Sequence, residues 1–300
     1  MTSAKKREAF FGYLFALPWL VGFSVFLIYP IGRSLYYSFC DYSVLRSPVF
    51  TGINNYSKLM HDEVFVQSLM NTVFFAFISV PLGTVVSLGL AMLLNTKVRG
   101  QAWYRTFFFL PSLIPAVPIA VLGLWLFNGE HGIINHLLRE MHIFQIFNMK
   151  EPNWLGDPNF TKPVLVLMAV WAGGNAMVIY LAGLQEVPKQ LYEASDLDGA
   201  TPWQKTRNVT LPLLSPIILF NVIMAIIGSL QYFTQAYVMF PNGQPARSTY
   251  MYTMYLYDNA FPFQNMGYAC AMGWILFLII LAMTLGAFKL SQRHVHYEGG

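Results

Sequence analysis

The chain has 300 residues, of which 56% are hydrophobic and only 11% are charged. So small a charged fraction excludes an ordinary soluble domain and favours a membrane protein. The net charge of +4 is accounted for by the membrane topology that the sequence predicts, so we infer no nucleic-acid partner.

Six charge-free runs are long enough to cross about 30 Å of hydrocarbon as helices. They are residues 10–31, 72–94, 106–128, 163–185, 213–240 and 267–288. The sequence therefore predicts an all-α integral membrane protein with six transmembrane helices, and we interpret residues 1–300 as a single transmembrane domain.

The first run follows Lys5, Lys6 and Arg7 and is longer than twenty residues. It ends at Tyr29-Pro30 without an Ala-x-Ala site, so we expect an uncleaved first span rather than a signal peptide. With the N-terminus inside, 11 of the 18 Lys and Arg residues lie on the cytoplasmic side. The positive-inside rule then predicts cytoplasmic N- and C-termini and a cytoplasmic loop at residues 187–212.

The second and third runs differ in their helix-breaking residues. Gly83, Ser87 and Ala91 repeat at i+4 along the second run, which favours close packing against a neighbouring helix. The third run contains Pro111, Pro115 and Pro118. Three prolines free backbone groups and bend a helix, which a membrane tolerates only against protein or water, so we expect this span to border a path.

The stretch from residue 129 to 162 is the longest external segment, and it contains three histidines. His131, His136 and His142 accompany Glu130 and Glu140. A zinc site is conceivable, but the spacings match no ligand motif, and solvated loop residues are the favoured interpretation.

Neutral polar side chains mark the fourth and fifth runs. Trp171 and Asn175 lie at i, i+4 in the fourth, and Asn221, Ala225, Gly228, Tyr232 and Gln235 recur at steps of four and three in the fifth, with Gln231 beside them. The candidate substrate-path residues are Trp171, Asn175, Asn221, Gln231, Tyr232 and Gln235. Amides and aromatic rings without formal charge suit a polyhydroxylated ligand, although interhelical hydrogen bonds explain such residues equally well.

Aromatic residues gather after the fifth run, from Tyr250 to Phe263. An interfacial belt is their commonest role near a membrane. A gate or a docking surface is the alternative.

Residues 187–212 form the longest segment that can only be soluble helix. Pro188 suits the start of a helix, Leu191, Ala194 and Leu197 share one face, and Gly199 allows a turn. Thr201 and Pro202 suit the start of a second short helix, in which Trp203 supplies an anchor. Such a helical pair between two spans would form a rigid protrusion to which a partner protein binds. A helix lying on the membrane surface is the alternative interpretation.

Motifs in this loop resemble a known family. Glu193-Ala194-Ser195, Gly199 and the closing 209–212 segment Val-Thr-Leu-Pro resemble the EAA loop of the membrane subunits of ABC importers, with Ser195 replacing the usual second alanine. The external residues 52–56, Gly-Ile-Asn-Asn-Tyr, are similar to the sugar-permease branch of these importers.

The resemblance implies a type I importer permease whose loop inserts into a groove on an ATPase. The coupling residues that it implies are Leu191, Glu193, Ala194, Gly199, Trp203 and Pro212. Glu193 would make the polar contact, Gly199 would allow the turn, and the apolar members would fill the groove.

The resemblance also implies the partners and the energy source. These are a second homologous permease, two ATP-binding subunits, an extracellular or periplasmic solute-binding protein and an oligosaccharide substrate, in the cell membrane of a bacterium or archaeon. The chain has no phosphate-binding Gly-Lys-Ser/Thr loop. We therefore expect no enzymatic site and no cofactor on this chain, with ATP and Mg²⁺ held by the partner subunits.

Two alternatives stay open from the sequence. The same machine could carry glycerol-phosphate or another small solute. A standalone channel or secondary carrier is disfavoured, because an ion-coupled carrier usually needs a charged or histidine side chain inside the membrane and the six runs have none.

Overall fold

The computed structural model describes residues 3–96, 99–146 and 150–291. The chain divides into two compact units: residues 1–62 with 256–277 form the first, and residues 63–255 with 278–300 form the second. Lys97 and the basic tail from residue 292, on which the predicted orientation partly rests, lie outside the described residues.

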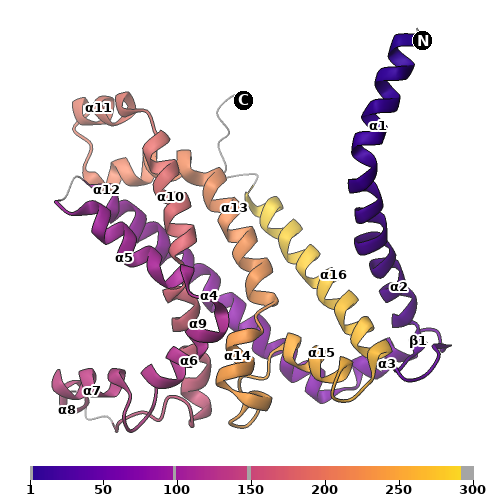
Figure 1. Cartoon of the computed structure of the whole chain (residues 1–300). Coiled ribbons are helices and arrows are strands. Elements are labelled where there is room, and N and C mark those ends of the chain that lie inside the picture. The colour runs from indigo at the N-terminus through magenta and orange to yellow at the C-terminus, as the bar shows by residue number, and fades with distance from the viewer. Residues whose placement is uncertain (1–2, 97–98, 147–149, 292–300) are drawn as a thin grey trace. The chain divides into compact units, whose positions relative to one another are not determined.

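The first unit begins with a long apolar helix. Its elements are α1 (Ser3–Phe23), the π-helical turn η1 (Ser24–Ile28), α2 (Tyr29–Ser38), β1 (Cys40–Asp41), β2 (Val49–Phe50) and α3 (Asn54–Met60) (Figure 1). Residues 10–38 form one candidate membrane span, and none of its apolar window is buried by the described part of the chain. This helix is hydrophobic on all sides, as expected of a segment surrounded by lipid or by another membrane subunit.

A hydrogen-bonded corner holds the end of the first span that is formed by α2. Strands β1 and β2 pair antiparallel, with Cys40 opposite Phe50. The buried Asn55 amide donates to the carbonyl oxygens of Ser38 and Cys40, at 2.9 Å each. The Gly267 N–H donates to the Tyr42 carbonyl at 3.0 Å, and a Cβ at Gly267 would lie 2.1 Å from the Cys40 carbonyl oxygen. Only glycine fits there.

The second unit contains most of the helices. They are α4 (Glu63–Leu94), α5 (Gln101–Leu113), α6 (Ala116–Leu126), α7 (Ile133–Glu140), α8 (Ile143–Ile146), α9 (Pro158–Trp171), α10 (Gly174–Glu186), α11 (Lys189–Leu197), α12 (Pro202–Lys205), η2 (Thr206–Thr210), α13 (Leu211–Leu230), α14 (Thr234–Met239) and η3 (Pro241–Gly243). Two further helices, α15 (Tyr252–Ala260) and α16 (Met266–Ser291), run from one unit into the other.

Helix α4 is the central element of the second unit and packs against α9, α10 and α13 (Figure 1). One buried cluster includes Phe75, Leu165 and Met239. A second includes Tyr180 and Leu214. Both clusters draw side chains from α4, so this helix fixes the positions of the others.

Several predicted spans are broken helices. The run 106–128 bends by 102° between α5 and α6, at Ile114 and Pro115, and the run 163–185 bends by 42° between α9 and α10. Proline explains the first break, because Pro115 cannot donate a helical hydrogen bond. At the second, a Cβ on Gly174 would lie 2.9 Å from the Phe108 carbonyl oxygen, so the break lies where α10 meets the backbone of α5.

The segment after α14 is fastened to the start of α4. The Asn71 amide donates to the carbonyl oxygens of Arg247 and Tyr250, at 2.9 and 3.1 Å. The Tyr252 N–H donates to Thr72 Oγ1 at 2.8 Å. Tyr250 and Tyr252 are buried, so the interfacial-belt interpretation does not apply to them, whereas Phe261 and Phe263 are exposed.

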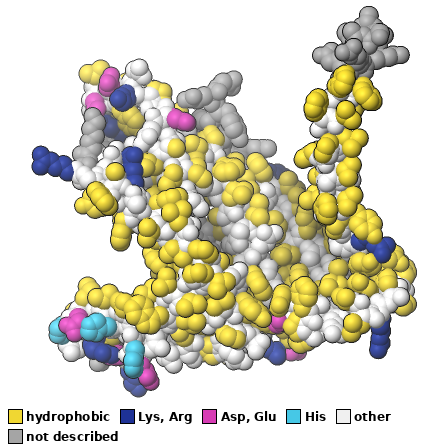
Figure 2. Space-filling view, in the orientation of Figure 1, with side chains coloured by type: hydrophobic (Ala, Val, Ile, Leu, Met, Phe, Trp, Pro, Cys, Tyr) yellow, Lys and Arg dark blue, Asp and Glu magenta, His cyan; other side chains and the backbone are white. Residues whose placement is uncertain are grey.

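The surface of the second unit is apolar between two polar ends. Figure 2 shows charged side chains at the end formed by α11 and α12 and at the opposite end formed by α7 and α8, with hydrophobic side chains between them. Among the described residues, four helices are long and apolar enough to cross a membrane, or six if each bent pair counts as one span. The prediction of an all-α membrane protein is confirmed.

Candidate functional site

A cavity of about 280 Å³ lies between α4, the α9–α10 break and the α13–α14 break. Small residues make room for it: a Cβ at Gly83 or Gly228 would meet no atom within 4 Å. Of the described residues that line it, none carries a charge. Its polar residues are Ser79, Thr84, Ser87, Tyr180, Asn221, Ser229, Tyr232 and Gln235.

Two tyrosine hydroxyls in this wall make no hydrogen bond of normal geometry with the described residues, although Thr84 lies close to one of them, that of Tyr180. They belong to Tyr180 on α10 and Tyr232 between α13 and α14, and both hydroxyl oxygens are buried. The Tyr232 ring packs against Phe75, with 4.4 Å between ring centroids, and Thr253 donates to the Tyr232 carbonyl at 2.7 Å. The Tyr232 ring is thus held in place, and an unpaired buried hydroxyl is free to bond a ligand or water.

The structure gathers the polar stripe predicted on the fifth span. Asn221, Ala225, Gly228, Tyr232 and Gln235 all line the cavity, although the helix breaks at residues 231–233. Asn221 Nδ2 donates to the Ile217 carbonyl at 3.0 Å, which leaves its amide oxygen available.

Three other predicted substrate-path residues lie away from this cavity. Gln231 and Asn175 are exposed, and Trp171 lines a separate apolar cavity of about 400 Å³ with Pro111. The helix expected to carry Trp171 and Asn175 on one face is interrupted between α9 and α10. Ser79, Thr84 and Tyr180 also line the cavity, although the polar pattern of the fourth and fifth runs does not predict them. The hydroxyl residues near Gly83 on the second span indicate the first two.

The loop between α10 and α13 forms the predicted pair of short helices. Helix α11 has no buried residue, and Leu191, Leu197 and Trp203 are 41%, 91% and 69% exposed. Glu193 and Ala194 are exposed beside Leu191, and Pro212 is half-buried in the first turn of α13. An apolar surface of this kind outside the membrane is a candidate contact for another subunit.

The turn between the two helices follows the predicted chemistry. Gly199 has φ +71°, a left-handed conformation that favours glycine. Thr201 accepts a hydrogen bond from the Gln204 N–H, and the Gln204 side chain accepts one from the Thr201 N–H, which is a capping box. Pro188 is the N-cap residue of α11, one position before the predicted first turn.

Two side-chain contacts clasp α11 to the chain that follows. The Tyr192 hydroxyl bonds the buried Thr210 hydroxyl at 2.9 Å, and Asp196 pairs with Lys205. We call these two pairs the clasp. Residues 202–239 form one candidate span that runs from α12 through η2, α13 and α14. Elements α12, η2 and α13 follow one another without interruption over residues 202–230, a segment that we call the rod, and Tyr232 lies in the break that follows it.

Comparison with known proteins decides the family. Residues 79–295 match the family described as the inner membrane component of binding-protein-dependent transport systems. The chain belongs to this family. The probable ABC transporter permease protein YesP of Bacillus subtilis is 38% identical over 98% of this chain and 94% of its own. The lactose transport system permease protein LacF of Rhizobium radiobacter is 35% identical over 97% of both chains.

Solved structures show the same fold. A bacterial ABC transporter that imports the acidic polysaccharide alginate matches with a TM-score of 0.82 at 23% identity, over 97% of this chain and 98% of the other. The same transporter in complex with an alginate-pentasaccharide-bound periplasmic protein gives 0.81 at 22% identity, over 97% and 96%. The predicted type I importer permease architecture is confirmed, and the chain is a multi-pass ABC transporter permease.

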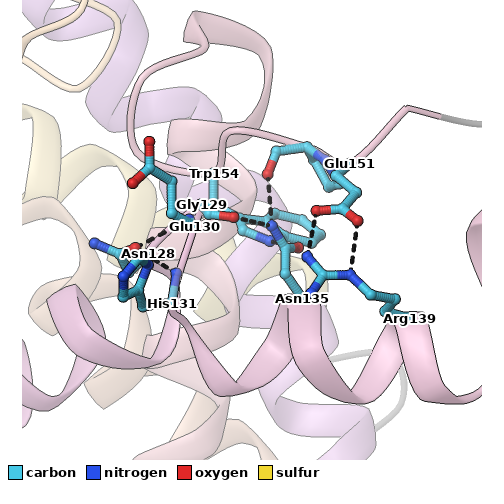
Figure 3. A network of polar contacts seen from close by, with 9 residues as sticks. Asn128, Gly129, Glu130, His131, Asn135, Arg139, Glu151 and Trp154 are labelled. Carbon is cyan, nitrogen blue, oxygen red and sulfur yellow. Dashed lines mark hydrogen bonds and ion pairs between the residues drawn. The ribbon is translucent and has the colours of Figure 1, made fainter.

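The permease also has an ordered polar network between α6 and α9 (Figure 3). The buried Asn135 amide donates to the carbonyl oxygens of Gly129 and Pro152, at 2.8 and 3.2 Å, and Trp154 Nε1 donates to Asn135 Oδ1 at 2.7 Å. Arg139 donates twice to the Glu151 carboxylate, at 2.8 and 2.7 Å, which lowers the pKa of Glu151.

The histidines of this segment do not assemble a metal site in the described part of the chain. No three His, Cys, Asp or Glu side chains there are close enough to hold an ion. The His131 N–H donates to Asn128 Oδ1 at 2.9 Å, as in an ordinary capped turn. The network is thus a structural support for the segment.

Proposed function

We propose that this permease is the transmembrane subunit of an ATP-driven carbohydrate importer and forms half of its translocation path. The observation that carries the proposal is the uncharged wall of the 280 Å³ cavity, which offers hydroxyl, amide and aromatic groups. Amides and hydroxyls bind sugar hydroxyls, and aromatic faces pack on the apolar faces of pyranose rings.

The unpartnered hydroxyls support a polar cargo. Each costs free energy in the empty permease, on the order of 1–3 kcal/mol, because its lost hydration is not replaced. A sugar hydroxyl at Tyr180 or Tyr232 would remove that cost. The lactose permease among the relatives supports the same class of substrate.

A phosphorylated solute is the second candidate, and the cavity argues against it. A phosphate group needs cationic or clustered N–H partners. None of the described lining residues is Lys, Arg or His. We therefore favour a neutral sugar or oligosaccharide over glycerol-phosphate.

The exposed loop would couple the permease to ATP binding and hydrolysis by the partner subunits. Leu191, Ala194 and Trp203 would enter a groove on an ATP-binding subunit, and Glu193 would make a polar contact at its rim. The clasp and the rod of residues 202–230 would carry the movement to the cavity wall at Tyr232. ATP must favour one arrangement of the ATPases over the other, since equal affinity shifts no population.

The proposed assembly contains a second homologous permease, two ATP-binding subunits and a solute-binding protein. ATP and Mg²⁺ would bind the ATP-binding subunits, so this chain contributes transport without catalysis. The polar end at α11 and α12 would face the cytoplasm, together with both termini, and the network at Asn135 would face the outside of a bacterial or archaeal cell membrane.

ATP hydrolysis by the purified complex in lipid tests the proposal, with and without binding protein and a panel of oligosaccharides. We expect one sugar to stimulate hydrolysis, and Glu193→Ala and Gly199→Pro to abolish the stimulation. Glu140→Ala, at the opposite polar end, is the matched control and should behave as the native chain. Transport by the isolated chain in liposomes without ATP would instead establish a standalone carrier.

A further inference from the structure

A third cavity, of about 400 Å³, lies between α5 and α10, and none of the residues that line it is assigned above to coupling or substrate. These helices lie side by side, next to the end of the unit that carries α11 and α12 (Figure 1). The residues that line it are Arg105, Thr106, Phe109, Val178, Leu181, Ala182 and Gln185.

The cavity is polar at one end and apolar at the other. Arg105 and Thr106 lie early in α5, and Gln185 lies one residue before the end of α10, so all three lie toward the polar loop. Phe109 lies four residues after Arg105 in α5, and Val178 lies seven residues before Gln185 in α10. Along a helix these separations are about 6 and 10 Å, so both side chains lie deeper than the polar ones. A ligand here would need a polar head and an apolar tail.

The guanidinium of Arg105 carries one buried donor that the described residues leave unpaired. Its Nε atom is buried and has no hydrogen-bond partner among the described residues. No Asp or Glu occurs among the described residues of the cavity wall. A buried donor on a permanent cation calls for an anionic acceptor, and a phosphate oxygen fits the planar fork of arginine.

We infer that this cavity binds an anionic phospholipid of the cytoplasmic leaflet, with its phosphate at Arg105 and an acyl chain against Phe109 and Val178. A zwitterionic lipid fits less well, because its ammonium group would find no carboxylate in the wall. The cytoplasmic placement rests on the proposed orientation of the loop, whereas the binding itself is independent of the transported solute.

The test uses the whole complex in phosphatidylcholine nanodiscs that contain phosphatidylglycerol bearing a photoactivatable acyl chain. We expect the label on peptides of α5 and α10, and a loss of about tenfold in apparent affinity for phosphatidylglycerol in Arg105→Gln. Arg99→Gln is the matched control, because Arg99 is an exposed cation six residues earlier that does not line the cavity. Ala182→Trp, which fills the apolar part, should also exclude the label.

Several outcomes would overturn the inference. Equal losses in Arg99→Gln and Arg105→Gln would show unspecific attraction to a charged surface. Displacement by inorganic phosphate alone would show that no acyl chain is held. Loss of the ATP-binding subunits from Arg105→Gln would show that Arg105 pairs with a partner carboxylate. Sugar-stimulated hydrolysis, measured in parallel, reports separately on the proposed function.

Discussion

Tyr232 shows how one residue can link packing to specificity. Its ring is fixed against Phe75, while its buried hydroxyl finds no partner in the described chain. An unpaired buried hydroxyl costs free energy, and a bound ligand that hydrogen-bonds to it would remove that cost. The Tyr180 hydroxyl is also buried without a hydrogen bond to the described residues, and only the fold reveals either, because the sequence gives no sign of whether a tyrosine hydroxyl is paired.

Tyr232→Phe should therefore separate stability from transport. We expect the free energy of unfolding without sugar to stay constant or to rise by up to about 1 kcal/mol, since an unpaired buried hydroxyl is removed. Sugar transport should fall roughly 5- to 30-fold, the equivalent of 1–2 kcal/mol. Thermal unfolding and uptake in proteoliposomes measure the two. Tyr237→Phe is the control, because this exposed tyrosine stacks on Phe233 without lining the cavity.

The Glu151 carboxylate predicts a pH response of the segment between α6 and α9. The hydrogen bonds from Arg139 lower its pKa from the ordinary value of a glutamate. The stabilisation is therefore present above the unfolded pKa and is lost as the pH falls through the lower folded value. Hydrogen-exchange protection of residues 128–146 and 150–157, corrected for the intrinsic pH dependence of exchange, should decrease as the pH falls below the ordinary glutamate value of about 4.3. Glu151→Gln should exchange faster already at pH 7, with a weaker change on acidification. An unaltered pH profile in this variant would contradict the assignment.

At the scale of elements, the clasp stiffens a loop that is otherwise exposed. It joins α11 to α12 and η2 through Tyr192–Thr210 and Asp196–Lys205. The π-helical turn η2 ends two residues before Pro212, and η1 likewise ends two residues before Pro30. Proline cannot donate to the residue four positions earlier, and the wider turn accommodates its ring.

Tyr192→Phe should loosen the coupling without dissociating the complex. Loss of one hydrogen bond, about 0.5–1.5 kcal/mol, should lower the sugar transported per ATP hydrolysed by roughly two- to tenfold. ATPase subunits should still copurify. Ser195→Ala is the control, because the Ser195 hydroxyl bonds only the Leu191 carbonyl within the same helix, at 2.7 Å. If both variants transport equally well, the clasp has no role in transmission.

Two glycines should respond in opposite ways to added volume. A Cβ at Gly174 would lie 3.0 Å from Phe109 Cα, so Gly174→Val must displace α5 and should destabilise by about 1–3 kcal/mol. Gly228→Val projects into the open cavity and should fold normally but transport poorly. Detergent-resistant thermal stability and uptake would distinguish the two. Equal stability of both variants would show that the α5–α10 contact is not tight.

Hydrophobic runs predict where helices lie because burial in lipid requires them, and the EAA-like residues predict the turn at Gly199. Neither predicts the break in the fourth span, whereas the prolines of the third run predict its bend. The interruption before Asn175 depends on close contacts of Gly173 with Ser87 and of Gly174 with Phe108, from segments distant in sequence. The polar stripe from Asn221 to Gln235 can be predicted from the sequence, because its residues still face one cavity on both sides of the α13–α14 break.

At the scale of the whole molecule, the two polar ends of the second unit provide positions at which the proposed membrane orientation can be tested. Leu197→Cys should react with an impermeant maleimide only from the cytoplasmic side, and His136→Cys only from outside. The native thiols give little background, because Cys40 is buried and Cys270 is partly buried. Right-side-out and inverted vesicles provide the comparison. Labelling of both positions from one side would overturn the orientation.

The 102° bend between α5 and α6 has a consequence for hydration. The last carbonyl groups of α5 and the first amide groups of α6 lose their helical partners at such a corner. Hydrocarbon offers no replacement, so only protein or water can solvate them. We therefore expect water to enter the bilayer beside Pro115 and to hydrate these carbonyl and amide groups, so that the third span borders water rather than hydrocarbon at this point.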